Sequence, residues 1–153
     1  THEAMTLFFA PIVVNDTIIA ADRDTIYALA RSDGQPVWKR NFGDRDVLPA
    51  AATAEQVYIK SVNQLWALDA HNGEVRWNYA ATNFVSLPAL TDELLYVITR
   101  SGGGSQLRAV RQRDGKEAWR SESLQLSNSA PVIANGRVYV RTVNGGIVGY
   151  RSN

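Results

Sequence analysis

One phrase of eleven residues occurs three times in this chain, at residues 28–38, 67–77 and 109–119. In each copy a glycine lies four residues before a tryptophan, and successive copies begin 39 and 42 residues apart. A period near 40 residues with a turn glycine and a fixed aromatic residue is typical of stacked β-sheet units, above all of β-propeller blades. The repeat therefore constrains the architecture more strongly than any other feature of the sequence.

Proline repeats with the same period, at Pro11, Pro49, Pro88 and Pro131. Each proline precedes a short run of small or β-branched residues. Proline is tolerated at the first position of a strand, where the ladder needs no backbone donor. We therefore expect each proline to open the first strand of a blade, which we interpret as its innermost strand.

Further β-rich runs follow each proline and are separated by polar turns. Four short antiparallel strands joined by hairpin turns make one blade. No stretch combines an N-cap residue with the apolar spacing of a helix, so the predicted fold class is all-β. We expect one propeller segment over residues 1–153, with three complete blades and one incomplete blade. Their approximate bounds are residues 9–48, 49–87, 88–130 and 131–153.

An open set of blades leaves two apolar sheet faces without a neighbour. Three arrangements would cover these faces: closure of a four-bladed ring, pairing of two chains into an eight-bladed ring, or membership of a longer propeller. We expect the sequence to come from a longer propeller, as a partial ring or as one half of eight blades. For the isolated chain we expect self-association, because two copies can close a ring without a free face.

The repeated residues have structural roles. Each turn glycine follows an aspartate or asparagine, a pair that favours a tight turn with positive φ at the glycine. Each repeated tryptophan is expected to pack between neighbouring blades, where a large aromatic side chain buries much apolar surface. Trp66 lies outside this register and is expected to be more exposed. The predicted blade-docking residues are Gly34, Gly73, Gly115, Trp38, Trp77 and Trp119, and the residues expected in or beside the core are Tyr58, Tyr96 and Tyr139.

The composition excludes several classes of function. The formal net charge is +1, which gives no electrostatic argument for binding nucleic acid or an anionic membrane. The chain has no cysteine, so disulfides, thiolate metal sites and a cysteine nucleophile are excluded. The apolar run at residues 7–14 is too short to span a bilayer. His2 and His71 have no second ligand at metal-binding spacing, so we predict neither a metal site nor a catalytic residue.

The second copy of the phrase, with Asp69, Gly73 and Trp77, resembles the PQQ-like repeat of quinoprotein-type β-propellers. The resemblance covers nearly the whole chain. The first and third copies depart from it at the acidic position, where Ala30 and Arg111 stand. In that family the tryptophan stacks against the neighbouring blade, as the packing argument also predicts.

The family has two broad uses. One comprises dehydrogenases that hold pyrroloquinoline quinone and calcium. The other comprises non-catalytic propellers such as the BamB lipoproteins, which assist β-barrel insertion into the bacterial outer membrane. The chain has neither the vicinal cysteine pair of the dehydrogenases nor a set of oxygen ligands that stands out for calcium. It looks more like the BamB type, which implies no cofactor, no catalysis, a protein partner and a periplasmic location, with a membrane anchor in the full-length protein left open. A fragment of a PQQ-dependent dehydrogenase and a sensor domain of a receptor or kinase remain the alternatives.

The stretch at residues 123–131 resembles the loop with which BamB-type proteins bind their barrel-assembling partner. Its two leucines are retained, whereas Ser127 stands where the family has an arginine. Apolar residues in exposed loops can anchor a partner, but they can equally fill gaps between blades. We expect the linkers between blades to share one face with the turns between second and third strands. The predicted partner-binding residues are Leu124, Leu126, Ser127, Asn128, Phe42 and Phe84.

Overall fold

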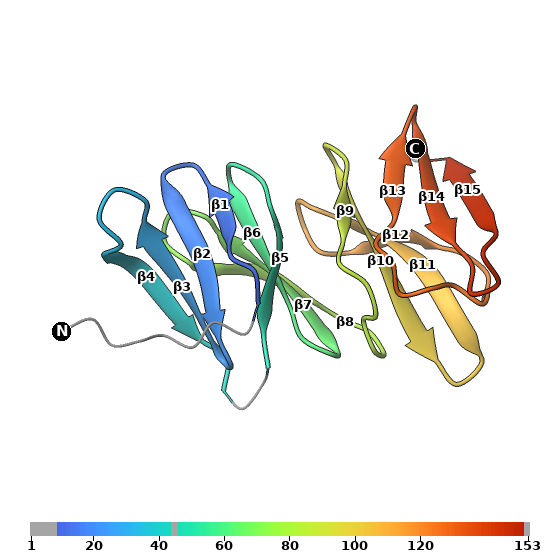
Figure 1. Cartoon of the computed structure of the whole chain (residues 1–153), viewed down its shortest axis with the longest axis horizontal. Coiled ribbons are helices and arrows are strands. Elements are labelled where there is room, and N and C mark those ends of the chain that lie inside the picture. Colours follow the sequence, from blue (N-terminus) through green and yellow to red (C-terminus); the bar gives the residue numbers. More distant parts are fainter. Residues whose placement is uncertain (1–8, 44–45, 152–153) are drawn as a thin grey trace. The chain divides into compact units, whose positions relative to one another are not determined.

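The computed structural model describes residues 9–43 and 46–151 (Figure 1). These residues form fifteen β-strands in four antiparallel sheets and contain no helix. Three of the sheets have four strands and the last has three. The predicted all-β class, with three complete blades and one incomplete blade, is therefore confirmed for this part of the chain.

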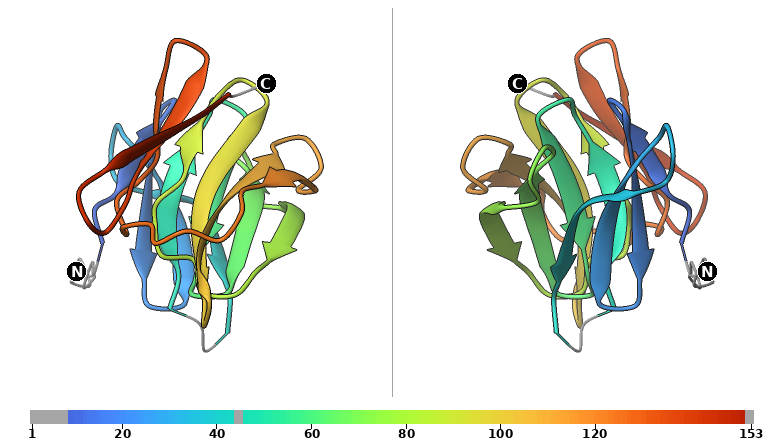
Figure 2. Two further views of the ribbon diagram at one scale, coloured as in Figure 1. Left: turned by 90° about the vertical axis from the view of Figure 1, so that its right-hand side faces the viewer. Right: turned by 90° about the vertical axis from the view of Figure 1, so that its left-hand side faces the viewer.

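Strands that follow one another in the sequence are neighbours in each sheet, as Figure 2 shows for the blue first sheet and the orange-red fourth sheet. The first sheet contains β1 (Ile12–Val14), β2 (Thr17–Asp22), β3 (Thr25–Ala30) and β4 (Pro36–Asn41). The second contains β5 (Leu48–Ala52), β6 (Gln56–Lys60), β7 (Gln64–Asp69) and β8 (Val75–Ala80). The third contains β9 (Ala89–Leu90), β10 (Leu94–Ser101), β11 (Gly104–Arg111) and β12 (Glu117–Arg120). The fourth contains β13 (Val132–Ala134), β14 (Arg137–Arg141) and β15 (Ile147–Arg151).

The chain divides into two compact units. Unit 1 comprises residues 1–61 and 65–78, with the first sheet and most of the second. Unit 2 comprises residues 62–64 and 79–153, with the third and fourth sheets. Each unit has a hydrophobic core of its own.

The prolines lie where the first strands begin. Pro11, Pro88 and Pro131 immediately precede β1, β9 and β13, and Pro49 is the second residue of β5. These positions demand few ladder hydrogen bonds from the proline nitrogen. The proline period therefore predicts the first strand of each sheet to within one residue.

The three glycine turns share one geometry, in which the φ angles of Gly34, Gly73 and Gly115 are 72°, 71° and 69°. In each turn the preceding Asp or Asn side chain accepts a hydrogen bond from the backbone N–H two residues further on. This is the local bonding for which such residues are favoured in turns. The predicted turn chemistry is thus confirmed in all three copies.

The core of unit 1 lies between the first and second sheets. Trp38 on β4 is 9% exposed, and its ring lies against the turn glycine of the second sheet, Gly73. The indole N–H donates to the Ala70 carbonyl at 3.1 Å, and the Arg40 guanidinium donates to the Gly73 carbonyl. Trp38 thus packs between the first and second sheets.

The core of unit 2 lies between the third and fourth sheets. Trp119 on β12 packs beside Tyr96, with ring centroids 6.2 Å apart, and beside Tyr150, at 5.6 Å. Trp119 is only partly buried, whereas Trp77 of the second sheet is 8% exposed. Trp119 thus packs between side chains of the third and fourth sheets and is more exposed than Trp38.

The expected exposure of Trp66 is wrong. Its side chain is 7% exposed, because Phe42 from the linker that follows β4 packs against its ring at 4.8 Å. Tyr58 and Tyr96 are fully buried and Tyr139 partly so, as expected. Within the described residues, no helix is both long and apolar enough to cross a membrane.

Candidate partner-binding loops

The linker between β12 and β13 carries four of the residues that the sequence indicates for a partner. We call residues 123–128 the leucine loop. Backbone hydrogen bonds join this loop to Ser105 at the start of β11 and to the turn between β14 and β15. In unit 2, therefore, a linker does lie beside turns that connect second and third strands.

Alternate leucines of the loop pair with different sheets. Leu124 exchanges two backbone hydrogen bonds with Ser105, at 2.7 and 2.8 Å. Two residues further on, Leu126 forms a β-bridge with Thr142, which follows β14. The leucine loop thus joins the third sheet to the fourth through its own backbone.

The side chains of the loop also alternate in exposure. Leu126 is fully buried in the core of unit 2, and Leu124 packs at the edge of the same core and is only partly buried. Gln125 and Asn128 are exposed, and Ser127 is partly buried. The side chains of this loop that a partner can reach are therefore those of Ser123, Gln125 and Asn128, with part of Leu124 and Ser127.

The side chain of Arg100, near the end of β10, is hydrogen-bonded to the leucine loop. Its guanidinium donates to the Leu126 carbonyl at 3.0 Å and to Oδ1 of Asn128 at 2.8 Å. Its Nε donates to the Ser105 hydroxyl at 3.2 Å. The loop therefore has an arginine against it although Ser127 replaces the family's arginine. Sequence reasoning missed Arg100 because nothing in the repeat pattern links β10 to a linker more than twenty residues later.

Phe42 and Phe84 belong to the equivalent linkers after β4 and β8, and both are interior residues. Phe42 is 8% exposed and Phe84 is 3% exposed. Phe42 donates its backbone N–H to the Asp24 carbonyl, and Phe84 donates to the Val62 carbonyl, each at 2.7 Å. These two phenylalanines fill space within the fold, which is the alternative that the sequence left open, and a partner cannot reach them.

Two exposed valines at this end of unit 2 were not predicted as contact residues. Val62, in the turn between β6 and β7, is 59% exposed. Val143, in the turn between β14 and β15, is 61% exposed. The two valines occupy matching turns in the repeat. An alignment of the repeat copies would have placed them together and indicated them as possible contact residues. Exposed apolar side chains in turns add to the accessible apolar surface that Leu124 offers.

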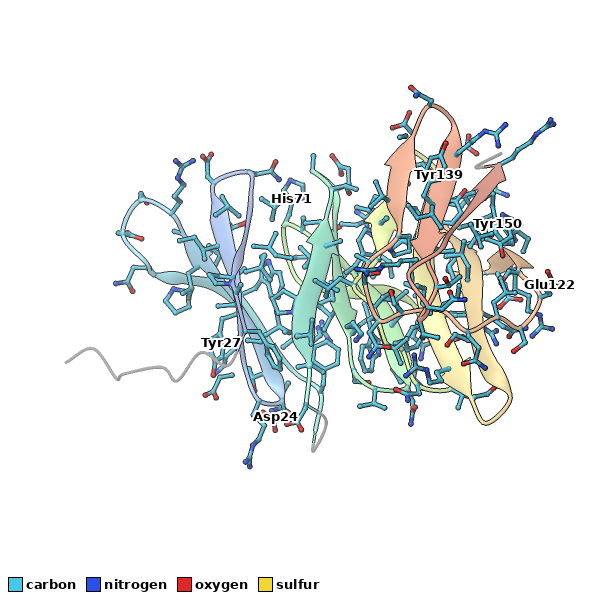
Figure 3. The ribbon with its side chains drawn as sticks, turned by 45° about the vertical axis from the view of Figure 1, so that its right-hand side comes forward. Asp24, Tyr27, His71, Glu122, Tyr139 and Tyr150 are labelled. Carbon is cyan, nitrogen blue, oxygen red and sulfur yellow. The ribbon has the colours of Figure 1, made fainter. Side chains whose placement is uncertain are left out.

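The turns and linkers at this end of unit 2 are almost uncharged. Among their residues, Glu122 is the one ionisable side chain (labelled in Figure 3). The remaining side chains are mainly amides, hydroxyls and small apolar groups. A partner here meets a mainly neutral polar surface, flanked by Arg100 and Arg141 at the strand ends. The segments concerned are residues 61–63, 81–87, 101–103, 121–130 and 142–146.

A polar network in unit 2 joins Tyr79 at the end of β8 to side chains of the third sheet. The Arg108 guanidinium donates to Oε2 of Glu117 at 2.8 Å and to the Thr99 hydroxyl at 2.8 Å. The Tyr79 hydroxyl donates to the same Glu117 oxygen. Burial raises the pKa of Glu117, but hydrogen bonds from Tyr79 and Arg108 and the charges of Arg108 and Arg120 outweigh it and lower that pKa. The network stabilises an ionised carboxylate, whose Oε2 accepts hydrogen bonds from both Tyr79 and Arg108.

No group of three or more histidine, aspartate or glutamate side chains that could hold a metal ion occurs within residues 9–43 and 46–151. His71 is exposed in its turn (Figure 3), with Nδ1 3.5 Å from the Asp69 carboxylate. His2 lies outside the described residues.

The sequence matches a family model described as outer membrane protein assembly factor BamB over residues 22–153. Outer membrane protein assembly factor BamB of Yersinia pestis is 27% identical over 148 residues, which cover 84% of this chain and 37% of that protein. The protein of the same name from Burkholderia pseudomallei (strain K96243) is 27% identical over 121 residues, which cover 77% of this chain and 31% of that protein. The chain thus spans about a third of the length of these curated relatives.

Solved structures share the fold. BamB from Moraxella catarrhalis matches with a TM-score of 0.71 at 17% identity, over 90% of this chain and 46% of that chain. The computationally designed Ika4 protein matches with a TM-score of 0.78 at 9% identity, over the whole of both chains. The designed Ika8 protein matches with a TM-score of 0.77 at 10% identity, over 93% of this chain and 45% of that chain. The four sheets are therefore propeller-type blades.

Proposed function

Because the chain belongs to the family of outer membrane protein assembly factor BamB, we propose that it is a non-catalytic propeller scaffold for outer-membrane protein assembly. In this role it binds a protein partner through the linkers between its blades. It works in the periplasm, and its partner is a periplasmic domain of the β-barrel assembly machine.

The leucine loop is the observation that carries this proposal. Its backbone is fixed to two sheets, and Leu126 secures it in the core of unit 2. A fixed loop loses little conformational entropy when it binds, so more of its contact energy appears as affinity. Leu124, only partly buried, is the apolar group that such a loop can offer as an anchor.

The surroundings of Leu124 indicate the kind of contact. The adjoining turn bears the exposed Val143 among uncharged polar side chains, and the exposed Val62 lies in the matching turn beside the preceding linker. Contacts between neutral groups are screened little by salt, in contrast to contacts between charged surfaces. We therefore expect the affinity for the partner to change less than about threefold between low and physiological salt.

The test is isothermal titration calorimetry of the chain with purified periplasmic domains of the β-barrel assembly protein. Leu124→Asp should weaken binding at least tenfold, because a carboxylate replaces the apolar anchor. Val75→Asp is the matched control: Val75 is 43% exposed on β8, outside these turns and linkers, and its replacement should leave affinity unchanged. Leu126→Asp is unsuitable, because a buried carboxylate at that position would unfold unit 2.

A second variant guards against misfolding of the first. Gln125→Trp adds a large side chain at an exposed position of the loop, without removing a core contact. It should reduce the affinity by steric obstruction while the urea midpoint stays that of the parent chain. Parental affinity in both Leu124→Asp and Gln125→Trp, with folding intact, would exclude the leucine loop as the binding site.

A further inference from the structure

One face of the fourth sheet is exposed on all three strands, apart from the partly buried Tyr139. Directly paired residues of an antiparallel sheet share a face, so the pairs Val132–Tyr139, Tyr139–Gly149 and Arg141–Ile147 place these side chains together. Ile147 is 73% exposed and Val132 is 61% exposed. Tyr139 is labelled on this sheet in Figure 3. We call this surface the arginine face; its members are Val132, Ala134, Arg137, Tyr139, Arg141, Ile147, Gly149 and Arg151.

The corresponding positions of other sheets are buried where the next sheet packs on them. The register aligns Tyr139, Arg141, Ile147 and Gly149 with residues that are 0% exposed in the cores of units 1 and 2. Such positions therefore form one half of a sheet-to-sheet junction. The buried counterparts are Ile19, Ala21, Ile26 and Ala28 of the first sheet, and Tyr96, Ile98, Leu107 and Ala109 of the third.

The first sheet offers the other half of the same kind of junction. We call Val13, Ile18, Tyr27, Leu29 and Val37 the opening face. Val13 is 59% exposed, Val37 is 51% exposed, and the other three are only partly buried. The counterparts of Ile18, Tyr27 and Leu29 lie buried or packed in the two cores; they are Val57, Trp66 and Leu68 in the second sheet and Val138, Val148 and Tyr150 in the fourth.

The glycine turn of the first sheet is also uncovered. A Cβ added at Gly34 would meet no heavy atom within 4 Å. A Cβ at the matching Gly73 would clash with the ring of Trp38, which packs on that turn from the preceding sheet. The turn of Gly34 therefore remains open to a neighbour on the side of the opening face.

The opposite net charges of the two units favour association between copies. Unit 1 has ten acidic and seven basic side chains, a net charge of −3, and unit 2 has five acidic and nine basic side chains, a net charge of +4. The arginine face includes three arginines and no carboxylate. Asp22 ends β2 and Arg141 ends β14, so the two lie at the same end of their sheets. Opposite net charges attract unit 2 of one copy to unit 1 of another.

We propose that two copies of this chain associate head to tail, with the arginine face of each on the opening face of the other. The junction repeats the packing of the two described cores and adds an Arg141–Asp22 ion pair. In the BamB structure from Moraxella catarrhalis and in Ika8, this chain corresponds to 46% and 45% of the other chain. The unmatched part of each of those two chains is therefore about as long as one copy of this chain, so two copies together have about the length of one such chain.

The first test is the mass of the 153-residue chain by light scattering after size-exclusion chromatography. The expected mass at micromolar concentration is twice the 16.9 kDa of one chain. Ile147→Glu and Val13→Glu should each raise the dissociation constant at least tenfold. Val75→Glu, at an exposed valine of β8, is the matched control and should leave the dimer intact. A wild-type mass of one chain would overturn the proposal.

A mixing experiment separates head-to-tail pairing from face-to-face pairing. Chains with Ile147→Glu retain the opening face, and chains with Val13→Glu retain the arginine face, so a mixture should form dimers through one intact junction. Sensitivity to Ile147→Glu alone, with Val13→Glu neutral, would mean that two arginine faces meet, and would overturn the proposal.

A charge exchange tests the ion pair independently of apolar contact. Arg141→Asp and Asp22→Arg should each weaken association several-fold, and a mixture of the two variants should associate more tightly than either variant alone. Added sodium chloride should weaken the wild-type dimer, since exposed charges are screened by salt. Salt-insensitive association, or a mixture no tighter than its components, would reject the charge-complementary junction.

Discussion

At the scale of single residues, the packing of one blade on the next depends on a contact between the Trp38 indole and the turn at Gly73. Gly73 has a φ of 71°, in the left-handed region that favours glycine. The Trp38 ring occupies the space where a Cβ would lie, at 2.5 Å from its Cε3 atom. Gly34 has nearly the same φ, 72°, but open space around it. An added Cβ would therefore cause backbone strain at both positions, but a steric clash only at Gly73.

Gly34→Ala and Gly73→Ala should differ in cost for this reason. Both variants pay the left-handed backbone penalty of about 1–2 kcal/mol, but only Gly73→Ala also displaces Trp38, which should add about 1–3 kcal/mol. Urea unfolding followed by tryptophan fluorescence measures both changes. Equal destabilisation by the two substitutions would show that the indole does not pack on the Gly73 turn.

The buried tyrosines provide a second matched pair. The Tyr58 hydroxyl donates to Oε1 of Gln56 at 2.6 Å, whereas the buried Tyr96 hydroxyl has no hydrogen-bond partner within the described part of the chain. Tyr58→Phe should lower the free energy of unfolding by about 1 kcal/mol. Tyr96→Phe should leave it unchanged or raise it, because a buried unpaired hydroxyl is removed. Chemical denaturation of both variants decides this, and a larger loss in Tyr96→Phe would contradict it.

Several residue-level expectations could not be drawn reliably from the sequence. The turn glycines and Trp38 follow from the spacing alone, because a hairpin needs its turn residue and a sheet needs its docking side chain. The burial of Trp66 depends on Phe42, which reaches it from a linker more than twenty residues earlier. Apolar linker residues have the same local pattern whether they face a core or a partner, so only the packed structure separates Phe84 from Leu124.

At the scale of the element, an ion pair between Asp69 and Arg76 stabilises the hairpin between β7 and β8. Arg76 on β8 donates to Oδ2 of Asp69 at 2.6 Å, and the backbone N–H groups of His71 and Asn72 donate to Oδ1. The Arg76 hydrogen bond and then the His71 N–H hold the pKa of Asp69 at about 2, below its ordinary value of 3.8. The carboxylate therefore prefers the folded state to the unfolded state.

This hairpin should make stability pH-dependent at the acid end. A folded pKa below the unfolded pKa means that the stabilisation is fully present above about pH 4 and is lost as pH falls toward 2. Asp69→Asn should lower the free energy of unfolding at pH 7 by at most about 1 kcal/mol, because the pair is partly exposed. Denaturation curves of variant and parent should converge near pH 2. A constant difference at all pH values would refute the role of the charge, and Glu74→Gln, at an exposed turn residue, is the control.

The strands themselves could be predicted well because two independent markers, proline and the Gly–Trp phrase, share one period. The pairing of the leucine loop with two sheets could not be predicted from the sequence. Leu124 and Leu126 bridge different sheets, and bridges outside regular strands leave no period in the sequence. Arg100 is likewise invisible to pattern reasoning, since its partners lie in another element and are mostly backbone atoms.

At the scale of the whole molecule, the proposed role implies that quinone chemistry is absent. The curated relatives described above are assembly factors, and no metal-holding carboxylate group occurs among the described residues. Titration with pyrroloquinoline quinone and Ca²⁺, followed by visible absorbance, should show no saturable uptake. Binding at one quinone per chain together with dye-linked alcohol oxidation would contradict the scaffold role and support the dehydrogenase alternative.

Buried and exposed side chains alternate in the leucine loop, so some of its positions are required for folding and others can be substituted. Leu126 belongs to the interior, so its replacement threatens the fold of unit 2 before any partner is involved. Gln125 is exposed on a backbone that is bridged to a sheet on either side of it. Asn128 is also exposed, but its replacement removes the hydrogen bond that its Oδ1 accepts from Arg100. In the proposed role, a library at residue 125 would therefore change which protein is recognised with less effect on stability than a library at residue 128.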